Sequence, residues 1–180
     1  MSLIPPLVER ARALVAQLGF EKSCRDDVGR MLHVLAARRG VERAAEVGGG
    51  TGMGTAWIAS ALGPGIPLFT VELDRRYAEA TSSLFEDDPD VHVLHGDWRV
   101  MLPPEAPFDL LFVVGGQAKD EVEAVLALAV PGATLVLDDV SADWAGPDPR
   151  RARWLGHERL TAVEVGTEGN AQAIVAVVRR

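Results

Sequence analysis

The segment from Glu46 to Gly54 reads Glu-Val-Gly-Gly-Gly-Thr-Gly-Met-Gly and links a short apolar run to a run with helical character. A chain that turns from a strand into a helix, with a ligand against its amides, favours residues that lack a Cβ atom and tolerate positive φ. The first N–H groups of the following helix are unpaired, and its dipole puts partial positive charge there. This segment therefore predicts a loop that binds a carboxylate or phosphate. A tight turn without a ligand is the alternative.

The spacing of the glycines narrows the class of ligand. The dinucleotide-binding pattern requires Gly-x-Gly-x-x-Gly or Ala, and the phosphate loop of nucleotide triphosphatases ends in Gly-Lys-Ser/Thr. The first pattern can start at Gly48, Gly50 or Gly52, and its final glycine or alanine then falls on Met53, Thr55 or Trp57. No lysine follows the glycines either. What fits is an acid followed by alternate glycines, namely Glu46, Gly48, Gly50 and Gly52. An NAD-dependent oxidoreductase is therefore disfavoured.

A second acid follows the loop at a suitable distance along the chain. Glu72 ends the apolar run from Leu68 to Val71, about 20 positions after Gly52, where dinucleotide-binding folds place an acid that contacts ribose. A carboxylate there can accept hydrogen bonds from two adjacent ribose hydroxyls. We expect Glu72 to hold a ribose, and an exposed acid at a strand end is the alternative.

The loop and Glu72 together resemble the cofactor-binding half of class I S-adenosylmethionine-dependent methyltransferases. Gly96-Asp97-Trp98 resembles the stretch that cradles adenine in this superfamily. The resemblance implies that Asp97 accepts a hydrogen bond from the adenine amine, and that Trp98 either stacks on the base or belongs to the core. We expect backbone amides of the loop to fix Glu46, which then contacts the cofactor only indirectly. The resemblance covers about residues 28–179.

The ends of the fourth and fifth predicted strands look like those of the catechol-type O-methyltransferases, a family of small-molecule enzymes. Those enzymes place an aspartate after strand four and an Asp-Asn or Asp-Asp pair after strand five, around Mg²⁺. Here Val114 replaces the first aspartate and offers no oxygen ligand. Asp138 and Asp139 alone make a weak site, so a divalent metal is doubtful. Gln117 stands near the family's lysine or histidine base and cannot take a proton at neutral pH.

These departures leave three readings of the chemistry. Asp138 or Asp139 acts as a base or orients the acceptor without metal, or methyl transfer relies mainly on alignment of the reactants. In the third reading the Asp pair only caps a strand, and the chain binds S-adenosylmethionine in a regulatory or assembly role without transferase activity. The leading hypothesis is a methyltransferase that uses S-adenosylmethionine and acts on a small-molecule acceptor, at an oxygen.

Two other segments contain candidate acceptor or lid residues. Ser23 and Arg25 precede the second predicted helix, in a segment that helps to close over the cofactor in related enzymes; surface capping is the alternative. Aromatic and basic residues cluster between Ser141 and Glu158, where they could form a wall and attract an acidic acceptor. They are Trp144, Trp154, Arg150, Arg151 and Arg153. A solvated basic helix with buried tryptophans is the alternative.

Strand and helix signals alternate along the chain. Strands are expected at Arg43–Val47, Pro67–Glu72, Val91–His95, Phe108–Val114 and Ala133–Leu137. Helices are expected at Pro5–Leu18, from Asp26 or Asp27 to before Gly40, and at Thr55–Leu62, Arg75–Phe85 and Lys119–Ala129. Leu160–Val165 and Ala173–Val178 read as a terminal hairpin. The prediction is an α/β fold: a Rossmann-like, doubly wound, mostly parallel seven-stranded sheet with an antiparallel C-terminal strand, helices on both faces and ligands at the carboxyl ends of the strands.

Composition limits the organisation and the partners. The 180 residues predict one domain, 1–180, with N-terminal helices and a lid (1–40), a cofactor-binding core (41–140) and an acceptor loop with the hairpin (141–180). The net charge of −8 disfavours nucleic acid. The single Cys24 and the lack of a secretory or membrane-spanning segment predict a cytoplasmic protein without a membrane partner. By family analogy the N-terminal helix is a candidate homodimer contact, and a monomer remains open.

Overall fold

The computed structural model describes residues 4–141, 149–168 and 171–180. Its strands are β1 (Ala44–Val47), β2 (Leu68–Glu72), β3 (Val91–His95), β4 (Phe108–Val113), β5 (Ala129–Ser141), β6 (Leu160–Gly166) and β7 (Ala171–Val178). Its helices are α1 (Pro6–Leu18), α2 (Asp26–Ala36), α3 (Met53–Ala59), α4 (Arg75–Leu84), α5 (Trp98–Met101), α6 (Val122–Leu126) and α7 (Pro149–Leu155). Single 3-10 turns cover Pro103–Glu105 (η1) and Ala118–Asp120 (η2).

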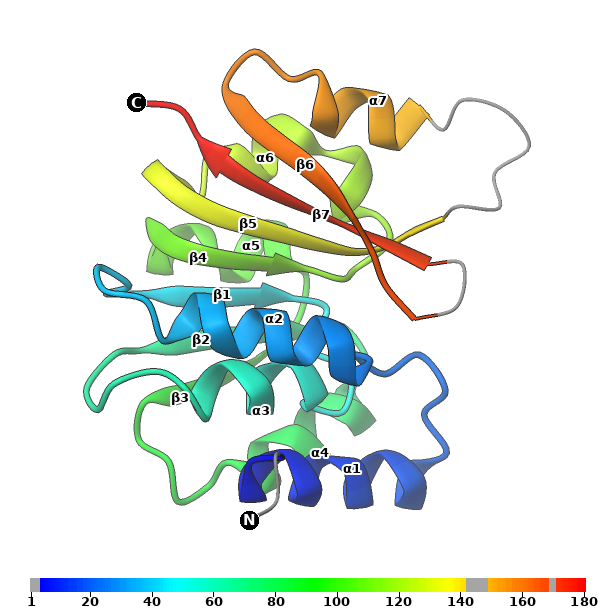
Figure 1. Ribbon diagram of the computed structural model, residues 1–180. Helices are drawn as coiled ribbons and strands as arrows, with labels where there is room; N and C mark the ends of the chain where they lie inside the picture. Colours follow the sequence, from blue (N-terminus) through cyan, green and yellow to red (C-terminus); the bar gives the residue numbers. More distant parts are fainter. Residues whose placement is uncertain (1–3, 142–148, 169–170) are drawn as a thin grey trace.

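The strands form one seven-stranded sheet in the order β3-β2-β1-β4-β5-β7-β6 (Figure 1). β1 to β5 pair in parallel, whereas β7 runs antiparallel to both β5 and β6. This arrangement confirms the predicted fold class, including the antiparallel terminal hairpin. Because β1 to β4 are parallel, their carboxyl ends lie along one edge of the sheet.

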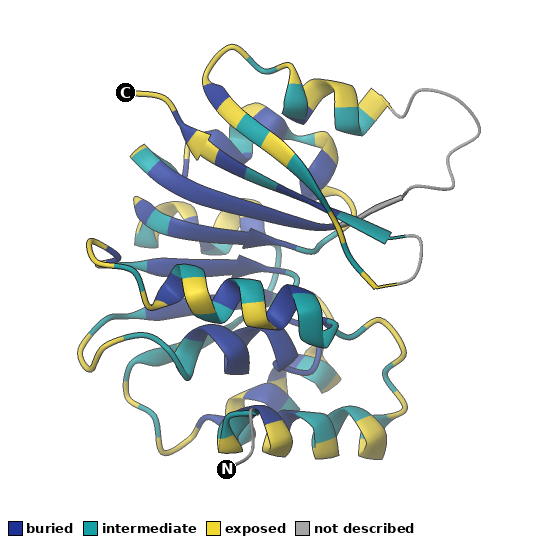
Figure 2. Ribbon diagram, in the orientation of Figure 1, coloured by how far each residue is buried: buried dark blue, intermediate teal, exposed yellow. Residues whose placement is uncertain are grey.

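Two hydrophobic layers hold the helices against the sheet. α1, α2 and α3 pack on one face through residues such as Leu32 and Trp57, and α5, α6 and α7 pack on the other through residues such as Leu102, Leu126 and Trp154. The central strands are buried along almost their whole length, whereas β6 at the edge has one buried residue, Leu160, and is otherwise exposed or half-buried (Figure 2). Within the described residues no helix is long and apolar enough to cross a bilayer.

The region between β4 and β5 differs from the sequence prediction. The expected helix Lys119–Ala129 is instead the turn η2 followed by the short helix α6, because Glu121 has non-helical backbone angles. Pro131-Gly132, taken as a helix stop, lies within β5, which begins at Ala129. A bulge accommodates these two residues, since the pairing register of β4 and β5 shifts between Phe108 and Leu110, and Gly132 has a φ of 90°.

Two smaller differences concern helix starts. The short helix α5 was not predicted, and Asp97 caps it by accepting a hydrogen bond from the backbone N–H of Arg99. α2 begins at Asp26 as expected, but its capping position is Arg25, whose side chain makes no capping bond. The acids Asp26 and Asp27 occupy the first turn, where they favour the helix dipole.

Candidate functional site

The glycine loop follows β1 and is fastened to the end of β2. The backbone N–H groups of Gly48 and Gly49 both donate to the carbonyl of Val71, each at 3.0 Å. Gly48 has a φ of 90°, and a Cβ atom on it would lie 2.8 Å from the backbone nitrogen of Gly115. Only glycine satisfies both constraints without a shift of the backbone. The loop thus packs its main chain directly against the end of β4.

Glu72 is oriented by this loop. One carboxylate oxygen accepts a hydrogen bond from the N–H of Gly50 at 2.7 Å, and the other accepts from the N–H of Asp74 at 2.8 Å. Each carboxylate oxygen can accept a further bond. The acid predicted to hold a ribose is therefore preorganised, with acceptor capacity left over.

Glu72 forms part of the wall of a cavity of about 220 Å³ at the carboxyl ends of β1 to β4. Gly48, Glu72, Asp97 and Trp98 are among the residues that line it. Leu73, which is 70% exposed, adds an apolar wall that sequence reasoning missed. The sequence feature that could have indicated this wall is a leucine directly after Glu72, the acid at the end of β2. The structure thus brings together the glycine loop, the acid predicted to hold a ribose and the stretch predicted to hold adenine.

Glu46 lies beneath the loop, in the protein interior. It is 1% exposed and accepts hydrogen bonds from the hydroxyls of Thr55 and Thr70 and from the backbone of Thr55. Burial raises its pKa to about 7, against the opposing effect of these bonds. A Cβ atom on Gly54 would lie 2.2 Å from its carboxylate. The backbone bond comes from Thr55 in α3 and not from the amides of the glycine loop, and two threonine hydroxyls that the sequence did not indicate accompany it.

Asp97 and Trp98 sit at the start of α5. Asp97 accepts from the backbone N–H of Arg99 at 2.9 Å and from its guanidinium at 2.7 to 3.1 Å. These bonds from Arg99 lower the pKa of Asp97. Trp98 is 9% exposed, lines the cavity and also belongs to the hydrophobic core. The two readings of Trp98 are therefore compatible.

Asp138, at the carboxyl end of β5, is almost fully buried and paired with an arginine. One Nη atom of Arg25 donates to Asp138 at 3.0 Å and to the hydroxyl of Thr167 at 2.9 Å. Asp27, two residues after Arg25, accepts a hydrogen bond from the backbone N–H of Glu168. The segment before α2 is therefore fastened to β5 and to the terminal hairpin. An aspartate held in this way is suited to positioning that segment.

The comparisons with known proteins agree with this geometry. The family model for protein-L-isoaspartate(D-aspartate) O-methyltransferase matches residues 12–137. The chain belongs to this family. The protein-L-isoaspartate O-methyltransferase of Brucella anthropi is 40% identical over 79 residues, which are 43% of this chain and 35% of the relative. That of Methanopyrus kandleri is 36% identical over 110 residues, 59% of this chain and 48% of the relative. The matches thus span between about a third and a half of these relatives.

Solved structures match the whole described fold. The O-methyltransferase from Bacillus cereus in complex with S-adenosylhomocysteine superposes with a TM-score of 0.84 and 24% identity, covering 98% of this chain and 93% of the other. The O-methyltransferase TomG from Streptomyces achromogenes, in complex with S-adenosylmethionine, gives 0.81 and 25%, covering 98% and 91%. The predicted resemblance to class I methyltransferases is confirmed.

The strand ends at which catalytic residues are predicted are described in part. Val114 lies beside a second, smaller cavity, and the exposed Gln117 lines the first. The side chain of Asp139 and all of Trp144 lie outside the described residues. Among the residues that are described, no group of three or more His, Cys, Asp or Glu side chains could hold a metal ion.

The basic helix α7 is engaged within the protein. Arg150 pairs with Asp120 at 2.8 Å, Arg151 pairs with Glu164, and Arg153 donates to the carbonyl of Asp120. Trp154 is 1% exposed and donates its indole N–H to the carbonyl of Lys119. Of the two alternatives for this segment, the described residues favour a helix anchored by a buried tryptophan over an aromatic wall.

Buried polar atoms test whether a ligand with a polar tail fits the site. The hydroxyls of Ser23 and Thr51 and the indole N–H of Trp98 are buried and have no hydrogen-bond partner within the described part of the chain. Ser23 and Thr51 line the second cavity, and Trp98 lines the first. Gly48 borders both cavities. Buried polar groups are rarely left without a partner, so these atoms fit a ligand that spans the two spaces.

Proposed function

We propose that this protein is a methyltransferase that uses S-adenosylmethionine and transfers a methyl group to an oxygen atom of a small-molecule acceptor. The observation that carries the cofactor part is the position of Glu72. Its carboxylate is held by the loop amide of Gly50 at the wall of the cavity that Asp97 and Trp98 also line. This combination provides acceptors for ribose hydroxyls and a recess for a base.

The two cavities divide the cofactor between them in this proposal. Glu72, Asp97 and Trp98 hold the nucleoside, while Ser23 and Thr51 offer hydroxyls to the amino-acid part. Glu46 is a supporting residue, because it orients Thr55 and Thr70 beneath the loop. The cofactor supplies a methyl group activated on a sulfonium.

The protein contributes alignment of the acceptor with that methyl group, which alone can supply several kcal/mol of the barrier. Asp138 and Asp139 are the proposed catalytic residues, acting to orient the acceptor without a metal. The fixed Asp138 carboxylate, held by Arg25, supports a positioning role over proton transfer. We place the activity in the cytoplasm, in line with one buried cysteine, Cys24. A homodimer through α1 remains a prediction.

A second candidate function is methylation of a carboxyl group on an isoaspartyl residue of a peptide or protein. The match of the family model over residues 12–137 and the two curated relatives favour it. In both candidates an oxygen attacks the methyl group. They differ in the product, which is a methyl ether or ester of a small molecule in the first and a peptidyl methyl ester in the second.

Product chemistry separates the two. Purified protein is incubated with S-adenosylmethionine labelled in the methyl group, once with an isoaspartyl peptide and once with a panel of small phenols and carboxylic acids. Label in a small molecule supports the leading proposal. Label in the isoaspartyl peptide that is released as methanol by mild alkali, with none from the matched aspartyl peptide, replaces it with the second candidate.

A third candidate is a protein that binds the cofactor without transferring its methyl group. Val114 and Gln117 motivate it, because Val114 offers no metal ligand and Gln117 no base. Binding of S-adenosylhomocysteine without label in any acceptor supports that reading. Label in any acceptor, lost when Glu72 is replaced by alanine, contradicts it.

A further inference from the structure

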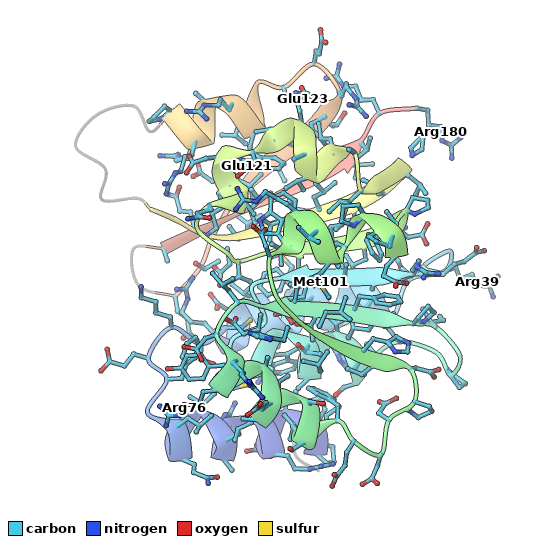
Figure 3. The ribbon with its side chains drawn as sticks, turned by 180° about the vertical axis from the view of Figure 1, so that it is seen from behind. Arg39, Arg76, Met101, Glu121, Glu123 and Arg180 are labelled. Carbon is cyan, nitrogen blue, oxygen red and sulfur yellow. The ribbon has the colours of Figure 1, made fainter. Side chains whose placement is uncertain are left out.

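Three charged side chains form a chain of ion pairs beside the wall of the first cavity. Arg99 binds Asp97 through Nε and one Nη atom and binds Glu121 through the other Nη atom at 2.9 Å. Asp97 and Arg99 both line the cavity. Glu121 lies just before α6; Figure 3 shows it on the face of the molecule that also bears Met101 of α5.

Arg99 controls both the direction and the charge of the Asp97 carboxylate. One oxygen of Asp97 accepts from the backbone N–H and from Nε of Arg99, and the other accepts from Nε and an Nη atom. The plane of the carboxylate is therefore fixed by a bidentate contact. An ionised carboxylate accepts hydrogen bonds and cannot donate them. The cavity wall thus presents a hydrogen-bond acceptor of fixed orientation.

Such an acceptor, placed opposite C6 of a purine, distinguishes bases by the group at that carbon. Adenine carries an exocyclic amine, which donates, whereas hypoxanthine carries a carbonyl at the same position, which accepts. A carbonyl facing a fixed carboxylate would leave both groups without a hydrogen and bring two negative atoms together. Sites built around a defined donor or acceptor discriminate strongly against analogues that cannot supply the partner.

We propose that Arg99, itself held by Glu121, is a positioning residue that fixes Asp97 as an acceptor and so makes this cavity select an adenine nucleoside over a hypoxanthine nucleoside. The proposal rests on the cofactor part of the proposed function. Arg99 acts through Asp97. Glu121 steadies Arg99 through the ion pair with its second Nη atom.

The alternative is that these side chains form a surface ion-pair network without a role in binding. Their side chains are between 34% and 45% exposed, and ion pairs at such positions contribute little to stability. Removing Arg99 should therefore leave the protein folded. A role in binding can therefore be distinguished from a surface ion-pair network, because Arg99→Ala should change the selectivity between the two ligands only if Arg99 acts in binding.

The test is calorimetric titration with S-adenosylhomocysteine and with S-inosylhomocysteine, which differ in the group at C6 of the base and in the hydrogen on the neighbouring ring nitrogen N1. The wild type should bind the adenine ligand at least roughly tenfold more tightly. Arg99→Ala should weaken the adenine ligand and leave the hypoxanthine ligand nearly unchanged, so that the ratio falls severalfold. Arg99→Lys should restore part of the ratio, and Glu121→Gln should lower it to a smaller extent.

Two further variants test whether the effect of Arg99 acts through Asp97 and whether it is specific to the cavity. Asp97→Asn should narrow or reverse the preference, because its amide can donate to a carbonyl. Arg75→Ala is the matched control, since Arg75 pairs with an acid on α4, is 78% exposed and does not line the cavity. An unchanged ratio in Arg99→Ala, or an equal loss for both ligands, overturns the proposal. A wild type that binds neither ligand refutes the proposed function itself.

Discussion

Replacing Glu46 by glutamine should change how the stability of the protein depends on pH. Glu46 is almost completely buried beneath the glycine loop, and burial raises the pKa of its carboxyl group from 4.5 to about 7 in the folded state. In the unfolded chain the group returns to its ordinary pKa. Between these two values the folded protein binds more protons than the unfolded chain does, so the free energy of unfolding must fall as pH rises.

The size of the effect follows from the two pKa values. A difference of one pKa unit corresponds to about 1.4 kcal/mol, so the shift of Glu46 corresponds to about 3 kcal/mol. This contribution is fully present below about pH 4.5, is lost as pH rises toward 7, and is constant above that. Glu46→Gln cannot ionise and should lack this component.

The assay is urea unfolding of the wild type and Glu46→Gln between pH 4.5 and 8. The wild type minus variant difference in free energy of unfolding should fall by about 3 kcal/mol from pH 4.5 to 7 and then level off. Glu79→Gln, an exposed position on α4, is the control and should show no such trend. A difference that is flat, or that rises with pH, refutes the reasoning. If Glu46→Gln does not fold, carboxyl NMR titration of the wild type should still find a midpoint near 7.

Three further predictions concern the ion pair between Arg25 and Asp138, the glycine loop and the role of a metal ion. Arg25→Ala should destabilise the protein by about 2 kcal/mol in urea unfolding, because it removes the arginine from the buried Asp138, whereas Arg75→Ala should change stability by less than about 0.5 kcal/mol. Gly48→Ala should cost at least about 1 kcal/mol by the same assay and abolish binding of S-adenosylhomocysteine, because the added Cβ meets the backbone of Gly115. A chelator should leave the affinity for S-adenosylhomocysteine unchanged in calorimetry, and a loss of affinity that Mg²⁺ restores would count against metal-free binding.

The loop and the sheet could be predicted because their signals are local. Alternate glycines after an acid indicate a turn that few other residues can make, and alternating apolar runs indicate parallel strands. Strand ends were therefore placed within a few residues for β1 to β4. Position at a strand end was also sufficient to place Glu72 and Asp97 at one cavity, because parallel strands end at a common edge of the sheet.

Other features depended on contacts that the sequence does not display. Arg25 and Asp138 are separated by 113 positions along the chain, so their pairing follows only from the fold. Pro131-Gly132 indicates a helix stop in isolation, and only the bulge in the sheet shows that the pair belongs to β5. The partnership of Asp97 with Arg99 was accessible in principle, since a capping aspartate followed two positions later by arginine is a local pattern.

The most direct test of the central claim is calorimetric titration of S-adenosylhomocysteine into the wild type, Glu72→Ala and the control Glu79→Ala. The wild type and the control should bind with equal affinity, and Glu72→Ala should bind at least roughly tenfold more weakly, because two ribose hydroxyls lose a charged acceptor. Absence of binding to the wild type, or an unchanged affinity in Glu72→Ala, would contradict the assignment of this cavity to the cofactor.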